Sequence, residues 1–209
     1  MKKLINKLKN KVKLNQKMFF FLGGLAIIGF LFGTFFITVL SGSDQTLVKN
    51  YIADFITMID QNKVNYQTTF INTLISQLSF IGTIWVLGIS IIGIPITLFM
   101  YFSKAFMLGF SIGSFVLQYK LKGTLLAFFY IFPHHIINLA VHTLLMVYSI
   151  KFSAKLIDSI FRKKTINFKA IINVYLGVLL FSVIVVVISS VFEVFVVPFI
   201  FKKLLFLIH

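Results

Sequence analysis

The chain has 209 residues, of which 59% are hydrophobic and only 12% are charged, and its mean hydropathy is +1.00. A soluble domain of this size could not cover so much apolar surface, so the composition predicts an all-α, polytopic integral membrane protein. The heavy use of Phe, Ile, Lys and Asn resembles the proteome of an AT-rich bacterium, so the membrane is expected to be a bacterial cell membrane. The net charge of +15 lies mostly in clusters that flank apolar runs, which favours membrane lipids rather than nucleic acid as partners, and the absence of cysteine excludes disulfides.

The N-terminal residues 1–17 contain seven lysines and precede the first apolar run, residues 18–40. The positive-inside rule therefore places the N-terminus in the cytoplasm. The run is longer than the ~7 to 15 residues of a cleavable signal peptide, so it is predicted to stay as the first span. Apolar residues at helical spacing among the lysines also allow an amphipathic helix on the membrane surface, and a simple topogenic charge cluster explains them equally well.

Residues 41–75 form the one sizeable polar segment, which is predicted to lie outside the cell. It opens with the helix-capping sequence "SGSD", shows an amphipathic helical pattern and carries three of the five acids. Its aromatic side chains Tyr51, Phe55 and Tyr66 are candidate docking residues for a partner protein. They are equally consistent with aromatic anchors at the membrane interface.

Residues 76–120 are long enough for two spans of about 20 residues each, which predicts a helical hairpin. Gly93 and Pro95 supply the break, because proline removes a helical donor and glycine tolerates a bend. Lys104 favours the cytoplasmic end, so the connection is predicted near 96–104. A single kinked helix with Lys104 reaching toward the interface is the alternative.

A turn at 119–124 leads to the fourth predicted span, residues 125–150, and then to a basic cytoplasmic loop at 151–170. Residues 172–198 form the fifth predicted span, and the C-terminus follows outside. Five spans place seven and six basic residues in the two largest inner segments, which agrees with this orientation.

Two glycine pairs at four-residue spacing occur in the first and third predicted spans: Gly29 with Gly33, and Gly109 with Gly113. Glycines at this spacing let two helix backbones approach closely in lipid. The pairs predict close packing, either between helices of one chain or in the interface of a homo-oligomer.

Polar residues also lie inside the last two spans. His134, Asn138 and His142 occupy one helix face, and interhelical hydrogen bonding is their default role because no carboxylate partner is evident for a metal or proton-relay site. Glu193 is the only glutamate and lies in "SSVFEVFVVP" with Pro198. It is predicted to lie at the interface or to pair with a buried His, Lys or backbone donor.

The sequence contains no HExxH metalloprotease motif and no P-loop. The outer segment is also too short to fold alone as a hydrolase domain. The sequence therefore predicts a protein that is not an enzyme and has no cofactor and no metal.

Several stretches resemble the stage II sporulation protein M family. They are the first glycine pair, "WVLGISIIGIPI", "KAFMLGFSIG" and "SSVFEVFVVP" followed by two lysines, in the order and spacing of that family. Many relatives carry a His-Gly-x-x-Glu pattern in the fourth span. The matching positions here are His134, His135 and Asn138, so the acid is absent.

The resemblance implies a non-enzymatic scaffold of the sporulation engulfment complex. Such a protein is expected to recruit two peptidoglycan hydrolases, an amidase and endopeptidase and a lytic transglycosylase, to the septum for wall thinning and membrane migration. The alternative is a transport subunit that couples to an ATPase, against which stands a near absence of intramembrane charge. An intramembrane enzyme built on the His residues and Glu193 is a third hypothesis.

Overall fold

The computed structural model describes residues 2–90, 92–161 and 167–204, and these are almost entirely helical, with no strand among them. Five helices are long and apolar enough to cross a membrane: α1 (Lys2–Val39), α3 (Tyr66–Gly88), α4 (Gly93–Tyr130), α5 (Phe132–Phe161) and α6 (Phe168–Val191), the last continuing toward the C-terminus. The predicted all-α fold with five spans is confirmed.

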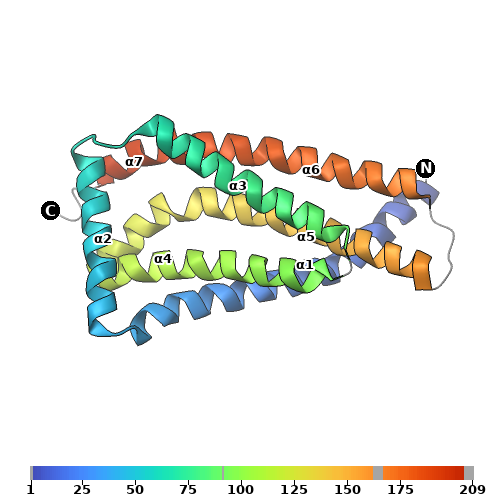
Figure 1. The fold of residues 1–209 in the computed structure, drawn as a ribbon, viewed down its shortest axis with the longest axis horizontal. Coiled ribbons are helices and arrows are strands. Elements are labelled where there is room, and N and C mark those ends of the chain that lie inside the picture. The colour runs from blue at the N-terminus through green and yellow to red at the C-terminus, as the bar shows by residue number, and fades with distance from the viewer. Residues whose placement is uncertain (1, 91, 162–166, 205–209) are drawn as a thin grey trace.

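The long helices lie side by side, and α2 (Gly42–Asp60) crosses one end of the bundle nearly at right angles to them (Figure 1). We call this the α2 end, and the other the far end. The helix α1 begins at the far end, whereas the C-terminal helix α7 (Val197–Leu204) lies at the α2 end, as an odd number of passes requires. Ile52, Ile56 and Ile59 of α2 are buried against the bundle.

The helix α4 reverses direction at Lys120, where the predicted turn at 119–124 lies. Lys120 has φ 52° and ψ −130°, which is not helical, and the helices on either side fold back on one another. A Cβ atom on Gly123 would collide with the carbonyl oxygen of Phe115, so the two arms meet at backbone distance. The second arm and α5 then form the fourth pass, which runs on past the predicted end at residue 150.

The chain reverses direction between Gly88, where α3 ends, and Gly93, where α4 begins. The predicted connection near 96–104 is therefore wrong. Pro95 lies in the first turn of α4, where the N–H that proline lacks has no helical partner. Gly93 is required for another reason, since a Cβ atom there would collide with the carbonyl of Leu87.

The tight turn leaves the last carbonyl groups of α3 without helical partners, and side chains of α5 and α6 supply the missing donors. Ser153 Oγ donates a hydrogen bond to the carbonyl of Gly88, and Tyr175 Oη donates to that of Trp85 at 2.9 Å. These bonds tie three passes together at the far end of the bundle.

The two glycine pairs meet in one interface between α1 and α4: Gly29, Gly33, Gly109 and Gly113. A Cβ atom on Gly33 would collide with the carbonyl of Phe106, and one on Gly109 with the carbonyl of Phe30. Thr34 Oγ1 also donates to the carbonyl of Gly109 at 3.1 Å across the interface. The pairs thus pack helices within one chain, which is one of the two arrangements expected from their spacing.

Candidate functional site

The polar residues of α5 lie on one buried face of that helix. His134, Asn138 and His142 are spaced by four residues and are 3%, 1% and 0% exposed, respectively. This face points toward α3, α4 and the C-terminal pass, and His142 lies against the ring of Phe80 of α3 with 4.5 Å between ring centroids. Groups of this kind at bilayer depth need protein or water as partners, because lipid offers none.

Glu193 lies in a short π-helix, η1 (Phe192–Val196), between α6 and α7. Pro198 explains this irregularity: it has no N–H for the carbonyl of Val194, and its ring would crowd that carbonyl in a regular α-helix. The wider π-turn relieves the crowding, and the backbone N–H of Val197 bonds to the carbonyl of Phe192. Pro198 thus helps to set the direction of Glu193, and π-turns of this type are frequent at functional sites.

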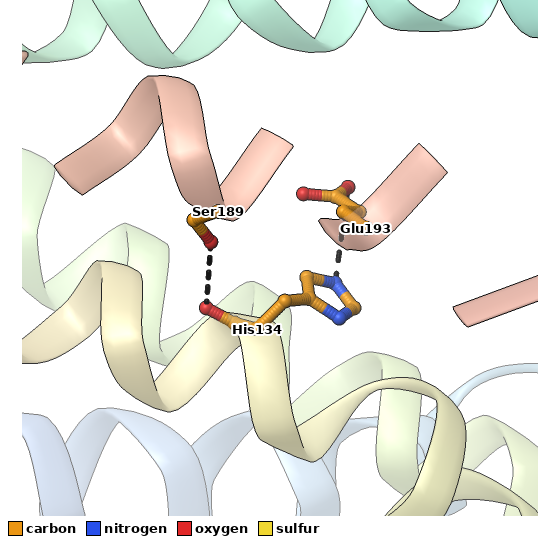
Figure 2. A network of polar contacts seen from close by, with 3 residues as sticks. All are labelled: His134, Ser189 and Glu193. Atoms are coloured by element: carbon orange, nitrogen blue, oxygen red, sulfur yellow. Dashed lines mark hydrogen bonds and ion pairs between the residues drawn. The ribbon is translucent and has the colours of Figure 1, made fainter. Parts of the chain in front are cut away.

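Glu193 and His134 face each other across the interface between η1 and α5. Figure 2 shows the His134 ring directed at the carboxylate, with 3.8 Å between His134 Nε2 and Glu193 Oε1. On the other side, Ser189 Oγ donates to the backbone carbonyl of His134 at 3.5 Å. Glu193 thus supplies the carboxylate partner that was not evident from the sequence for the histidine stripe, the face formed by His134, Asn138 and His142. Its side chain is 23% exposed, so Glu193 is a half-buried partner of His134, which is one of the roles expected for it.

Lys104 lies inside the membrane region, on the α5-facing side of α4. It is 11 residues beyond Gly93, which places it about 16 Å along a helix that must cross roughly 30 Å of hydrocarbon. Its Nζ lies over the ring of Phe80, 5.1 Å from the centroid. Within the described ranges no carboxylate lies within ion-pair distance of Lys104.

These groups line two neighbouring cavities. The first, which we call the Lys104 cavity, has a volume of about 240 Å³. Its wall is made by Lys104, Met107, Leu108, Ser111, His135, Asn138, Leu139 and His142. The second, the Glu193 cavity, has a volume of about 290 Å³ and contains Glu193 and His134 together with Tyr51 and other residues of α2. Ser111 and His135 belong to both walls, so the two cavities adjoin.

Several polar atoms around these cavities have no hydrogen-bond partner among the described residues. They are both side-chain atoms of the Asn138 amide, both ring nitrogens of His142, Nδ1 of His134 and Oε2 of Glu193. Buried polar groups normally find partners, and leaving one unpaired costs about 1–3 kcal/mol. The arrangement is therefore suited to receive water or a polar ligand.

A metal centre is not assembled by these side chains. Across residues 2–90, 92–161 and 167–204, no three His, Asp or Glu side chains come close enough together to hold a metal ion. Lys104 beside His135 and His142 also places a positive charge where a cation would have to bind.

The model of the family described as stage II sporulation protein M matches residues 18–198. The chain belongs to this family. No curated protein and no solved structure matches it significantly. Membership and the five spans indicate a multi-pass sporulation membrane protein, from a family that is not known as an enzyme family.

The three candidate docking residues of this family member differ in their surroundings. Tyr51 is 76% exposed on α2. Phe55 packs against the rings of Tyr130 and Phe201, so it contributes to the core. Tyr66 stacks on Phe195 and keeps only part of its surface free. Only Tyr51 presents most of its side chain to a partner.

Sequence reasoning singled out Lys104, the histidine stripe and Glu193 separately, and the structure brings them to adjoining cavities. It missed Ser111 and Phe80. Ser111 had a usable signal, because it follows Lys104 by seven residues, which is two helical turns and hence the same face. Phe80 had none, since it is one of 27 phenylalanines.

Proposed function

We propose that this sporulation membrane protein anchors peptidoglycan hydrolases at the septal membrane during engulfment. The amidase and endopeptidase and the lytic transglycosylase that act on septal wall would dock on its α2 end. Membership of the stage II sporulation protein M family supports this role, as does a bundle in which a separate helix, α2, crosses one end (Figure 1).

The observation that carries the proposal is the free face of α2. Its opposite face is buried on the bundle, while Leu47, Tyr51 and Met58 are 67%, 76% and 48% exposed. The helix also carries three aspartates against one lysine, in a chain whose net charge is +15. An exposed apolar stripe with acidic neighbours fits a partner with a basic rim around an apolar patch.

The orientation that this role needs places the α2 end outside the cell. Residues 1–17 hold seven basic residues and residues 151–170 hold six. These basic segments favour the cytoplasm for the far end of the bundle. The chain has no cysteine, so single substitutions can report on sidedness. A membrane-impermeant maleimide applied to intact cells should label Ser43→Cys in α2 and not Ser90→Cys in the far turn; the reverse pattern contradicts the orientation.

The docking role is tested by co-purification from membranes of the sporulating host. Leu47→Ala with Tyr51→Ala, and separately Asp54→Lys, should lower recovery of the hydrolases at least tenfold without changing the amount of inserted protein. The control is Leu180→Ala, an exposed position on α6 away from α2. Unchanged recovery with both α2 variants would remove the assignment.

A membrane subunit of a transporter is a second candidate, because two charged residues within the membrane-spanning segments, Lys104 and Glu193, lie at adjoining cavities. Lys104, His134 and Glu193 surround adjoining cavities inside the bundle. Solute flux in proteoliposomes that requires Lys104, or an ATPase that co-purifies in a fixed ratio, would favour this candidate over the scaffold.

A further inference from the structure

The Lys104 cavity is lined by hydrogen-bond donors and one positive charge. Lysine carries three donors, serine and histidine one each when neutral, and asparagine two. The polar residues of the wall are Lys104, Ser111, His135, Asn138 and His142, and none of the wall residues is a carboxylate. Glu193 belongs to the neighbouring cavity, beyond Ser111 and His135.

Two of these donors are buried and unpaired. Asn138 is 1% exposed and His142 is wholly buried, and neither side chain makes a hydrogen bond to any residue that the structure describes. Both residues form part of the cavity wall. A cavity of about 240 Å³ that holds unpaired polar groups has room for a polar ligand as well as water.

The charge of Lys104 also requires a partner in the cavity. A lysine near the middle of the hydrocarbon layer is costly unless a counter-charge neutralises it. The ring of Phe80 compensates only in part, because a cation–π contact is weaker than a buried ion pair. An oxyanion in the cavity would neutralise Lys104 and accept hydrogen bonds from Asn138 and His142 at once.

We propose that the Lys104 cavity is a binding site for an oxyanion, a phosphate or carboxylate group, held by Lys104 and by the donors of Asn138 and His142. No residue of the wall of the Lys104 cavity belongs to the docking surface on α2, so this proposal stands or falls separately from hydrolase recruitment.

Two sides of the site offer a route for a ligand. The Glu193 cavity leads to it from α2 and Tyr51, which gives a soluble anion a route from the α2 end. Met107 of its wall is 62% exposed on the bundle surface, which gives a lipid headgroup a lateral route. Toward the far end the bundle is closed by buried apolar side chains, including Leu145 and Met146.

The test uses the full chain in nanodiscs and two probes with the same chemistry. In discs of phosphatidylcholine, inorganic phosphate or acetate is titrated by calorimetry. In discs that also contain phosphatidylglycerol, native mass spectrometry counts the retained anionic lipid. Saturable phosphate or acetate binding identifies a soluble anion, and selective retention of phosphatidylglycerol identifies a lipid headgroup; either outcome supports the site only if it depends on Lys104.

Three variants decide that dependence. Lys104→Met and the isosteric Asn138→Asp should each weaken binding at least tenfold, whereas Lys104→Arg should retain it. Lys122→Met is the matched control, since it removes one positive charge from an exposed position near the Lys120 turn. Size-exclusion elution and circular dichroism establish that each variant is folded. Absence of binding to every probe, or equal binding by Lys104→Met and the native chain, would overturn the proposal.

Discussion

The two sides of α4 face very different neighbours. Toward α1 the helix presents Gly109 and Gly113, and the backbones touch with no room for a side chain. Toward α5 it presents Lys104 and Ser111, and the helices are separated by a polar cavity. Because lipid gives no hydrophobic drive between helices, close backbone contact on one side stabilises the bundle and leaves the other side free to hold polar groups.

The largest effect is expected from substitutions on the side of α4 that packs against α1. Gly33→Ala and Gly109→Ala each force a Cβ atom into a backbone carbonyl of the facing helix, and backbone cannot turn aside as a flexible side chain can. We expect a loss of about 1–3 kcal/mol in the free energy of unfolding, measured as a lower Tm by circular dichroism in detergent. Gly24→Ala is the control in α1, since nothing lies within 4 Å of its added Cβ; a similar loss there would contradict this explanation.

On the side of α4 that faces the Lys104 cavity, we expect a substitution to raise the free energy of unfolding rather than lower it. In the absence of a ligand, Lys104→Met removes from the membrane interior a charge that no carboxylate meets at ion-pair distance in the described part of the chain, and it keeps the length of the side chain. We expect the free energy of unfolding to rise by about 1 kcal/mol. The same thermal melt measures it, and a marked decrease in Tm would indicate that Lys104 already has a strong protein partner.

The contact between His134 and Glu193 is expected to couple these residues modestly. A double-mutant cycle with His134→Phe and Glu193→Gln should give a favourable coupling of about 0.5–1 kcal/mol, because the atoms lie 3.8 Å apart rather than at hydrogen-bond distance. The free energies come from urea or thermal unfolding of the four proteins in one detergent. Additive effects of the two substitutions would show that the residues do not interact.

The smallest effect is expected for Thr34→Val, which keeps the shape of the side chain and removes its hydrogen bond to the carbonyl of Gly109. Interhelical hydrogen bonds in membrane proteins average about 0.6 kcal/mol, so the Tm should fall only slightly. A loss as large as that of Gly109→Ala would mean that the hydrogen bond, rather than the close approach, holds α1 to α4.

Much of the fold was predictable, since hydropathy and length specify spans without knowledge of their partners. The helix that begins with Gly93 and Pro95 also follows from local backbone preferences. The turn at Lys120 does not, because it places a non-glycine residue at positive φ. The connection at 96–104 was mislocated because Lys104 was assumed to need an interfacial position. It remains inside because it faces a polar cavity, which no single-helix pattern reveals.

The sequence by itself determined the number of spans, the two glycine pairs and the polar face of α5, because each depends on periodicity along one helix. Only the tertiary structure decided that both glycine pairs share one interface, and that Lys104, the histidine stripe and Glu193 surround adjoining cavities. The physical reason is that two tight reversals and the π-turn before Pro198 set the rotation of one pass relative to the next. This rotation decides which faces of neighbouring helices come into contact.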